Sequence, residues 1–131
     1  MKPVILLLSL LLSSTAFAQS VPANTTREVG ELFTALEHSG CEFFRNGSWY
    51  DAQKASAHLH QKYDYLNNRG KITTTESFIE LAATKSSMSG EAYMVRCGAG
   101  TPVESRVWFT KELKGLRAKP AAPAKASKAS S

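Results

Sequence analysis

A histidine and a lysine, His58 and Lys62, stand four residues apart, a spacing that brings two side chains together on one face of a helix. An imidazole beside an ammonium group could hold an anion, and the imidazole could also act as the base of a small hydrolase or transferase. Arg45 is a candidate neighbour that would add to the positive charge. The plainer interpretation of such a pair is a solvated helix face.

Two aromatic residues, Phe44 and Trp49, flank the dipeptide Asn46-Gly47, which favours a tight β-hairpin because both turn residues accept a positive φ. The register of such a hairpin places Phe44 opposite Trp49 and puts both on one face of the sheet. The other face would carry the remaining apolar side chains of this segment: Cys41, Phe43 and Tyr50. If the first face stays open, its aromatic pair would suit a partner or a sugar-like ligand, whereas a covering helix would make the pair part of the core.

A serine-rich loop, residues 86–90, precedes a segment with the alternating pattern of a β-strand. Ser87 and Ser89, with backbone N–H groups and Tyr93 nearby, could hold an anion or contact a partner; a turn held by local serine hydrogen bonds is the alternative. Ser89-Gly90-x-x-Tyr93 also resembles the S-G-x-x-Y loop of the periplasmic lysozyme inhibitors, which would imply an inhibitor of an envelope hydrolase. That family is a β-barrel, whereas this chain is predicted to be mainly helical.

The motifs of common catalytic and cofactor sites are absent from the sequence. It contains no H-E-x-x-H, G-x-S-x-G, S-x-x-K or P-loop motif. His58 and His60 lie two residues apart, and side chains at this spacing on a helix point to different sides. We therefore expect no metal site and no cofactor, and a binding or interaction protein more than an enzyme.

The sequence contains two cysteines, Cys41 and Cys97. An even number in an exported chain indicates a disulfide, here one that closes a loop of 56 residues. The chain-entropy description gives such a crosslink about 4 kcal/mol of stabilisation. The alternative, a nucleophilic or redox thiol, lacks a C-x-x-C pair and an adjacent histidine.

The two ends of the chain differ in composition from its middle. Residues 1–18 begin with Met1-Lys2, continue with an apolar run and end in Ala16-Phe17-Ala18, the layout of a cleaved secretory signal peptide. The apolar run is shorter than the roughly 20 residues that a bilayer span needs, so we expect a periplasmic or secreted protein with no transmembrane segment. Residues 118–131 are Ala, Lys, Ser and Pro with nothing to bury and are expected to be disordered.

Much of the net charge of +5 comes from these ends. Lys2 and three C-terminal lysines account for four of the 16 basic residues, so 12 basic residues between positions 19 and 118 face 11 acidic ones. A nucleic-acid-binding domain normally carries a basic stripe or patch, and we therefore expect no nucleic-acid partner. Residues 19–117 suffice for one small domain with a single core.

Helices and strands that position these residues are predicted in the order α-β-β-α-α-β-α. Apolar residues at helical spacing predict helices over about 25–39, about 51–68 and from a Thr73/Glu76 capping box to about 84. Residues 91–97 alternate as a strand, and Thr101, Pro102 and Glu104 have the pattern that begins a last helix. If Cys41 bonds to Cys97, the simplest fold is α+β, a three-stranded antiparallel sheet with its first strand central and helices packed against it.

Several groups of residues follow one another along the middle of the chain: Ser39-Gly40-Cys41-x-Phe43-x-Arg45-Asn46-Gly47-x-x-Tyr50, Ala55-x-x-His58-Leu59-x-x-Lys62, Thr75-Glu76-x-Phe78-Ile79, Ser86-Ser87-x-Ser89-Gly90-x-x-Tyr93-x-x-x-Cys97, Trp108 and Leu113. As a set they resemble the YfeK-like family of small exported bacterial proteins, a domain-of-unknown-function family. The resemblance covers roughly residues 27–117 and implies a single domain in the bacterial envelope. It supplies no activity and no catalytic residues.

The sequence therefore predicts a non-enzymatic binding or interaction module of the bacterial envelope, whose partner would be an envelope protein or a cell-wall glycan. An inhibitor of an envelope hydrolase and a small hydrolase or transferase that uses His58 with Lys62 are the alternatives. Convergence of His58, Lys62 and a serine of the loop on one pocket would favour the enzyme. The residues expected to bind are Phe44, Arg45, Trp49, His58, Lys62, Ser87, Ser89 and Tyr93.

Overall fold

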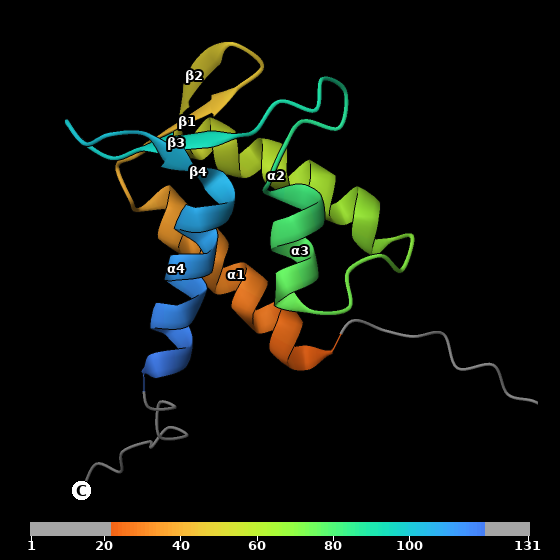
Figure 1. The fold of residues 1–131 in the computed structure, drawn as a ribbon. Coiled ribbons are helices and arrows are strands. Elements are labelled where there is room, and N and C mark those ends of the chain that lie inside the picture. Colours follow the sequence, from red (N-terminus) through yellow and green to blue (C-terminus); the bar gives the residue numbers. More distant parts are fainter. Residues whose placement is uncertain (1–21, 120–131) are drawn as a thin grey trace, which may run out of the picture.

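Four α-helices and four β-strands make up residues 22–119, the part of the chain that this computed structural model describes (Figure 1). In chain order they are α1 (Ala23–Glu37), β1 (Glu42–Arg45), β2 (Ser48–Asp51), α2 (Ala52–Asn67), α3 (Thr75–Ala82), β3 (Met94–Arg96), β4 (Val103–Glu104) and α4 (Ser105–Ala118). The predicted signal peptide, residues 1–18, and all but the first two residues of the predicted tail, residues 118–131, lie outside the described residues. Ala118, predicted to belong to the tail, is instead the last residue of α4. None of the described helices has the length and apolar character that a membrane span requires.

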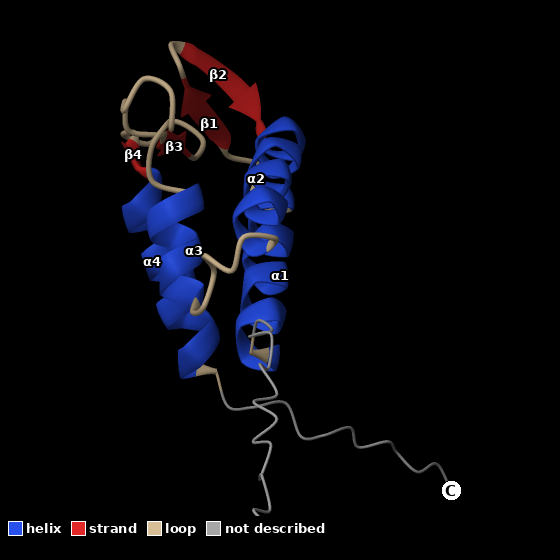
Figure 2. Ribbon diagram, turned by 90° about the vertical axis from the view of Figure 1, so that its right-hand side faces the viewer, coloured by secondary structure: helices blue, strands red, loops and turns tan. Residues whose placement is uncertain are grey.

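The strands form one antiparallel sheet in the order β2-β1-β3-β4, and the four helices lie on one side of it (Figure 2). β1 and β2 pair in the predicted register, with Phe44 opposite Trp49. Asn46 and Gly47 have φ values of 48° and 84°, the positive values that this two-residue turn requires. The first strand lies between β2 and β3, so the prediction of a central first strand is confirmed.

The sheet has a fourth strand, β4, which the sequence prediction of three strands does not include. Val103 pairs with Val95 and Glu104 with Met94 of β3. The helix-start pattern places Glu104 in the first turn of the last helix, but α4 begins one residue later, at Ser105. Pairing with β3 keeps residues 103–104 extended, and this long-range contact is not visible in the local signals that predict a helix start.

A disulfide joins Cys41 to Cys97, as predicted. Cys41 immediately precedes β1, Cys97 immediately follows β3, and the register sets Glu42 opposite Arg96. The two cysteines are therefore the next opposing pair along the ladder, with Cα atoms 4.2 Å apart. Neither cysteine is a free thiol, which removes the alternative of a reactive cysteine. Such a bond is compatible with an exported protein.

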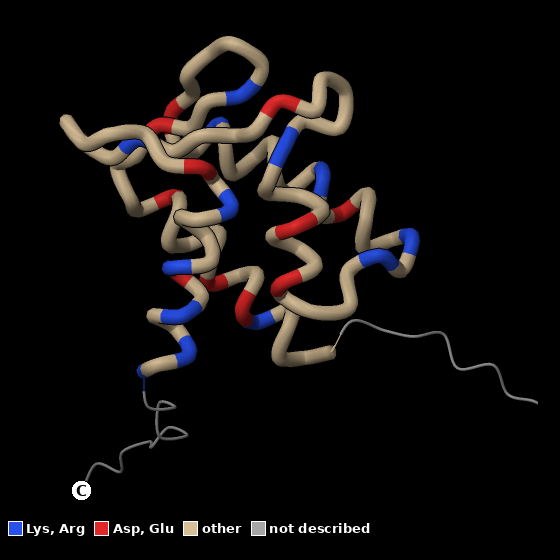
Figure 3. Tube along the Cα trace, in the orientation of Figure 1, with Lys and Arg blue, Asp and Glu red and all other residues tan. Residues whose placement is uncertain are grey.

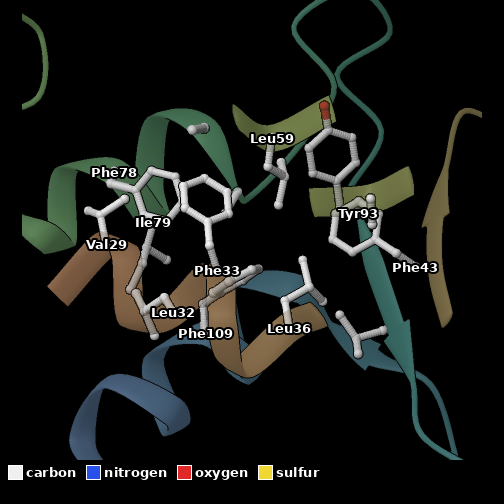
Figure 4. Close-up of a cluster of buried hydrophobic side chains, with 14 of the residues drawn as sticks. Val29, Leu32, Phe33, Leu36, Phe43, Leu59, Phe78, Ile79, Tyr93 and Phe109 are labelled. Atoms are coloured by element: carbon white, nitrogen blue, oxygen red, sulfur yellow. The ribbon is translucent and has the colours of Figure 1, made fainter. Parts of the chain in front are cut away.

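One hydrophobic core joins the four helices to the inner face of the sheet (Figure 4). Its centre is Phe78 of α3, whose ring contacts Phe33, Tyr63 and Phe109 from the other three helices. The sheet contributes Phe43 and Val95, both about 1% exposed. This packing fixes α2 against the sheet, and the contacts between α2, β1 and the segment before β3 create the candidate site described below.

The helix α3 is capped one residue later than the sequence pattern suggests. The N-cap is Thr74, whose hydroxyl oxygen accepts a hydrogen bond from Ser77 N, while Ser77 Oγ accepts one from Thr74 N. The predicted pair of Thr73 and Glu76 is therefore wrong by one position. Three consecutive threonines allow either register, and the burial of Thr75, which is 1% exposed, selects the observed one.

An ion-pair network ties α1, α3 and α4 together at the end of the molecule away from the sheet. Arg117 donates to both carboxylate oxygens of Glu28, at 2.9 Å each, and to Glu76 at 2.6 Å. Thr75 Oγ1 donates to Glu28 at 2.6 Å. Elsewhere, basic and acidic residues are interspersed along much of the described chain, but α4 carries more basic than acidic residues (Figure 3).

Candidate functional site

A hollow of about 260 Å³ opens between α2, the end of β1 and the loop that precedes β3. Most of the residues that line it have polar side chains, and two of them, Arg45 and Lys62, are positively charged. The residues that line it are Arg45, His58, Gln61, Lys62, Ser86, Ser87, Met88 and Tyr93. Five of the eight residues predicted to bind therefore meet here, from three separate segments of the chain.

The helix α2 presents His58 and Lys62 to this hollow. Asp51 caps the helix by accepting a hydrogen bond from Lys54 N, and the apolar positions Ala55 and Leu59 are buried against the core. His58 and Lys62 lie one turn apart on an adjoining, partly buried face. The helix thus holds an imidazole and an ammonium group side by side, next to the sheet.

Tyr93 forms the floor of the hollow. Its side chain is 2% exposed and its ring packs against Phe43, at 5.1 Å between ring centres. Figure 4 shows its hydroxyl group pointing away from the apolar cluster. This hydroxyl lies 3.2 Å from His58 Nε2 and accepts a hydrogen bond from Lys62 Nζ at 3.3 Å. Lys62 Nζ also donates to the backbone carbonyl of Lys85 at 2.7 Å, which fixes the position of the ammonium group.

The serine loop closes one side of the hollow through its own hydrogen bonds. Ser86 is 3% exposed, and its hydroxyl oxygen accepts from Met88 N and Ser89 N at 3.2 Å each. Ser89 Oγ donates to Asn46 Oδ1 in the hairpin turn at 2.9 Å, which anchors the loop to the β1–β2 hairpin. Ser87 is exposed and lines the hollow, whereas Ser89 lies at the neighbouring turn and does not.

Positive charge in the hollow is not balanced by any carboxylate among the residues that line it. Burial lowers the pKa of His58 from 6.5, and the nearby charges of Arg45 and Lys62 lower it further. Burial also lowers the pKa of Lys62, with a further contribution from Arg45. Arg45 Nε is buried and has no hydrogen-bond partner among the described residues. The hollow therefore has an unused donor at Arg45 and mutually repelling positive charges, and a bound anion would pair with both.

Tyr93 has its pKa raised by burial, an effect that the nearby Arg45 opposes. Its phenol is thus neutral at ordinary pH and can donate its proton. Since Lys62 can only donate, Tyr93 Oη accepts from Lys62 and can pass its own proton toward Nε2 of a neutral His58. Lys62, Tyr93 and His58 thus form a short hydrogen-bonded chain that borders the hollow.

The geometry of the hollow supports an anion-binding site better than the active site of a hydrolase. His58, Lys62 and Ser87 do converge on the hollow, the condition that favours an enzyme. The hydrogen-bond partner of His58 Nε2 is Tyr93 Oη, however, and the hydroxyl oxygen of Ser86 accepts hydrogen bonds from the N–H groups of the loop. Nucleophilic catalysis needs a hydroxyl within hydrogen-bond reach of the base, and residues 22–119 contain no such serine–His58 contact.

The aromatic pair Phe44 and Trp49 lies on the opposite face of the sheet. The two rings are 5.2 Å apart, both side chains are partly exposed, and no described helix lies on this side (Figure 2). The guanidinium of Arg96 stacks over the Trp49 ring at 4.0 Å and pairs with Glu42 at 2.8 Å. This face is accordingly separate from the hollow, and the two predicted sets of binding residues form two surfaces.

Gln61 and Met88 line the hollow but are missing from the sequence-based set of binding residues. Gln61 stands three positions after His58, so helical spacing alone places it on the same face and could have identified it. Met88 is 93% exposed at the loop tip, and its place beside the hollow depends on how the loop folds back toward the hairpin. No local signal in the sequence contains that information.

Another hollow, of about 390 Å³, lies between α3 and α4. Its charged residues carry both signs, and Arg117 at its edge is already paired with Glu76 and Glu28. Among residues 22–119, moreover, no three His, Cys, Asp or Glu side chains are grouped as a metal site would require. Of these two hollows, the one around Tyr93 is lined by positively charged side chains and by no carboxylate.

The fold and these features define a small α+β domain with one disulfide and a cationic hollow beside its sheet. Residues 23–117 match a family described as a family of unknown function, DUF5329, and the chain belongs to this family. It is also 33% identical to the uncharacterized protein YfeK of Salmonella typhimurium strain LT2, over 93 residues that cover 70% of this chain and 75% of the relative. The resemblance to the YfeK-like family is thereby confirmed. No solved structure matches the chain.

Proposed function

We propose that the chain is an exported, non-enzymatic binding module of the bacterial envelope, and that its cationic hollow receives an anionic group of the ligand. The observation that carries the proposal is the set of Arg45, His58 and Lys62 in one hollow that no carboxylate lines. Grouping like charges is unfavourable unless a counter-charge joins them. The periplasmic location belongs to the same proposal and is supported by the N-terminal sequence and by the disulfide.

A titration of the purified protein with anions tests the anion site. The chain should gain thermal stability when sodium sulfate or acetate is added at constant ionic strength, because an anion bound to the folded state stabilises it. Lys62→Met should remove most of this gain. Lys54→Met is the matched control, since it removes the same charge from an exposed position of the same helix. Equal gains in both variants, or no gain in the parent protein, would contradict the site.

The partner that carries the anion is proposed to be an envelope protein or a cell-wall glycan, with the Phe44–Trp49 face as a second contact. Partly exposed aromatic rings are typical of surfaces that bind proteins or sugars. Trp49 fluorescence reports on this face once Trp108, the second tryptophan, is replaced by phenylalanine. Titration with soluble peptidoglycan fragments should change this emission, and the change should disappear in Phe44→Ala. An unchanged emission at millimolar fragment would argue against a glycan partner.

A small hydrolase or transferase is the second candidate, favoured by the convergence of His58, Lys62 and Ser87 on one hollow. The absence of a serine–His58 hydrogen bond in residues 22–119 makes binding the better supported function. Turnover of p-nitrophenyl acetate or p-nitrophenyl phosphate separates the two. We expect no turnover above the buffer rate; a rate that vanishes in His58→Gln would replace the binding proposal by the enzyme.

Inhibition of an envelope hydrolase is the remaining alternative. The Tyr93 of the Ser89-Gly90-x-x-Tyr93 segment is 2% exposed and packs in the core, so it could not enter an enzyme's cleft without opening the domain. This burial argues against a protruding inhibitory loop. A lysozyme activity assay with excess purified protein is expected to show an unchanged rate, and dose-dependent inhibition would restore the alternative.

A further inference from the structure

The charge of the hollow carries information about the kind of anion that fits. Arg45 contributes a guanidinium group to the hollow and Lys62 an ammonium group, whose pKa burial and the charge of Arg45 lower from 10.5. With His58 neutral, the hollow holds two positive charges that no lining carboxylate offsets. A carboxylate would leave one of them unbalanced, whereas an anion with two negative charges would balance both. If His58 also gains a proton, the excess is one positive charge with a dianion and two with a carboxylate.

The segments that supply the donors also favour an anion with two negative charges. Arg45 approaches from the end of β1, Lys62 and His58 from α2, and Ser87 from the loop before β3. Donors supplied by three separate segments suit an anion with three free oxygens arranged around one atom. A carboxylate has two oxygens in one plane and suits a single flat donor such as one guanidinium.

We propose that the hollow binds a tetrahedral dianion, a phosphate monoester or a group of the same chemistry, and that His58 takes up a proton as this anion enters. The inference rests on the anion site proposed above and adds the class of anion and its coupling to a proton. A phosphate monoester has its second pKa near 6, so it is largely doubly charged at neutral pH.

The proton coupling follows from the groups that face His58. Burial is the main reason that the pKa of His58 lies below its ordinary 6.5, and the positive charges of Arg45 from β1 and Lys62 from α2 lower it further. Tyr93, from the segment before β3, faces His58 as a neutral phenol. The loop's flanking charges, Lys85 and Glu91, are exposed and do not line the hollow. A bound dianion would offset both positive neighbours and so raise the pKa of His58.

Protonation would also change the direction of one hydrogen bond. A neutral His58 accepts the proton of Tyr93 at Nε2, whereas a charged His58 donates from Nε2 to Tyr93 Oη, 3.2 Å away. The hydroxyl of Tyr93 then no longer donates its hydrogen bond to His58 and can donate it to an oxygen of the anion instead. The proton that His58 gains comes from solvent, and no covalent bond other than N–H is made or broken.

Isothermal titration calorimetry with sulfate and acetate tests the class of anion. Sulfate is tetrahedral and stays doubly charged across the accessible pH range, so any pH dependence of its binding belongs to the protein. At pH 7 and constant ionic strength, sulfate should bind about tenfold more tightly than acetate. Equal affinities would overturn the dianion assignment while leaving the anion site intact; binding of neither ion would remove both.

Proton uptake is measured on the same samples. If the protein takes up a proton from the buffer, the heat of sulfate binding should differ between two buffers of different ionisation enthalpy, in proportion to the number of protons taken up. This difference should vanish in His58→Gln. NMR titration of the histidine Cε1–H signals should show a higher pKa for His58 in sulfate, with His38 and His60 as internal controls that do not shift. Sulfate binding without uptake and without a shift at His58 would overturn the coupling.

The source of the phosphate is resolved by two further ligands. Glycerol 1-phosphate represents a soluble monoester, and phosphatidylcholine vesicles containing phosphatidic acid represent a lipid headgroup. Binding of glycerol 1-phosphate with the affinity of sulfate would identify a soluble ligand, and binding of the vesicles alone would identify a membrane surface. Failure of both, with Lys62→Met as the reference for non-specific adsorption, would overturn the phosphate assignment.

Discussion

Replacing Glu28 by glutamine should lower the free energy of unfolding by about 2 kcal/mol at pH 7. The Glu28 side chain is only 11% exposed and accepts hydrogen bonds from Arg117 and Thr75. The hydrogen bond from Arg117 is the main reason that the pKa of Glu28 falls from 4.5 to about 2, and burial opposes it. A difference of this size between the folded and unfolded states corresponds to roughly 3 kcal/mol. Because Arg117 is 45% exposed, solvent screening reduces the expected loss to about 2 kcal/mol.

The pH dependence of this loss identifies its cause. A carboxylate with a lowered pKa stabilises the fold fully above the ordinary value of 4.5, and the stabilisation is lost as the pH falls to about 2. Glutamine does not titrate in this range. The difference in unfolding free energy between the parent protein and Glu28→Gln should therefore be constant from pH 7 to about 5 and shrink toward zero below that.

Urea unfolding followed by circular dichroism, at fixed ionic strength and at pH values from 7 to 2.5, measures this difference directly. Glu31→Gln is the matched control, because Glu31 lies one turn further along α1 in an exposed pair with Arg27. It should cost no more than about 0.5 kcal/mol. A pH-independent loss for Glu28→Gln, or an equal loss for the two variants, would refute the role of the buried ion pair.

Three further substitutions probe the fold. Replacing Cys41 and Cys97 by serine should cost about 4 kcal/mol in urea unfolding, since the bond closes a loop of 56 residues; unchanged stability would show that the bond does not restrain the unfolded chain. Gly47→Ala should cost about 1 kcal/mol because φ is 84° there, and a stable variant would mean that the turn had changed type. Leu59→Ala, at 0% exposure, should cost about 3 kcal/mol, whereas Leu81→Ala, at 42%, should change the melting temperature little.

The hairpin could be predicted from sequence because its determinants are local. Asn46 and Gly47 set the turn type, the turn type sets the register, and the register placed Phe44 beside Trp49 on the face away from Phe43. The Cys41–Cys97 pairing spans 56 residues and is not local, but it could be predicted because the sequence has only two cysteines and was expected to be exported; the antiparallel ladder agrees with it.

The strand β4 and the N-cap of α3 were not predicted correctly from sequence because both depend on contacts between distant segments. Val103 and Glu104 carry a helix-start pattern, yet pairing with β3 holds them as a strand. The cap of α3 shifted because burial of Thr75 chose between two possible threonine registers.

In the candidate site, too, the local relationships could be predicted from sequence and the contacts between distant segments could not. The spacing of His58 and Lys62 is a local property of one helix, so their proximity was predictable. Their common neighbour, the hydroxyl of Tyr93, reaches them from 31 to 35 residues away in sequence. The hydrogen bond from Ser89 to the hairpin turn, which orients the loop, likewise spans 43 residues.

The Cys41–Cys97 bond also determines what a single cut in the backbone would do. The tip of the loop before β3 is the most accessible stretch near the hollow, with Met88 93% exposed. A protease that cleaves there leaves Cys41 on one fragment and Cys97 on the other, so the sulfur bridge keeps the two pieces as one molecule. Arg45, His58 and Lys62 would stay with the first piece and Tyr93 with the second, joined across the sheet. In denaturing electrophoresis, a nicked form would therefore migrate at full mass until a reductant is added. The residues that line the hollow would stay together although the backbone between them is cut.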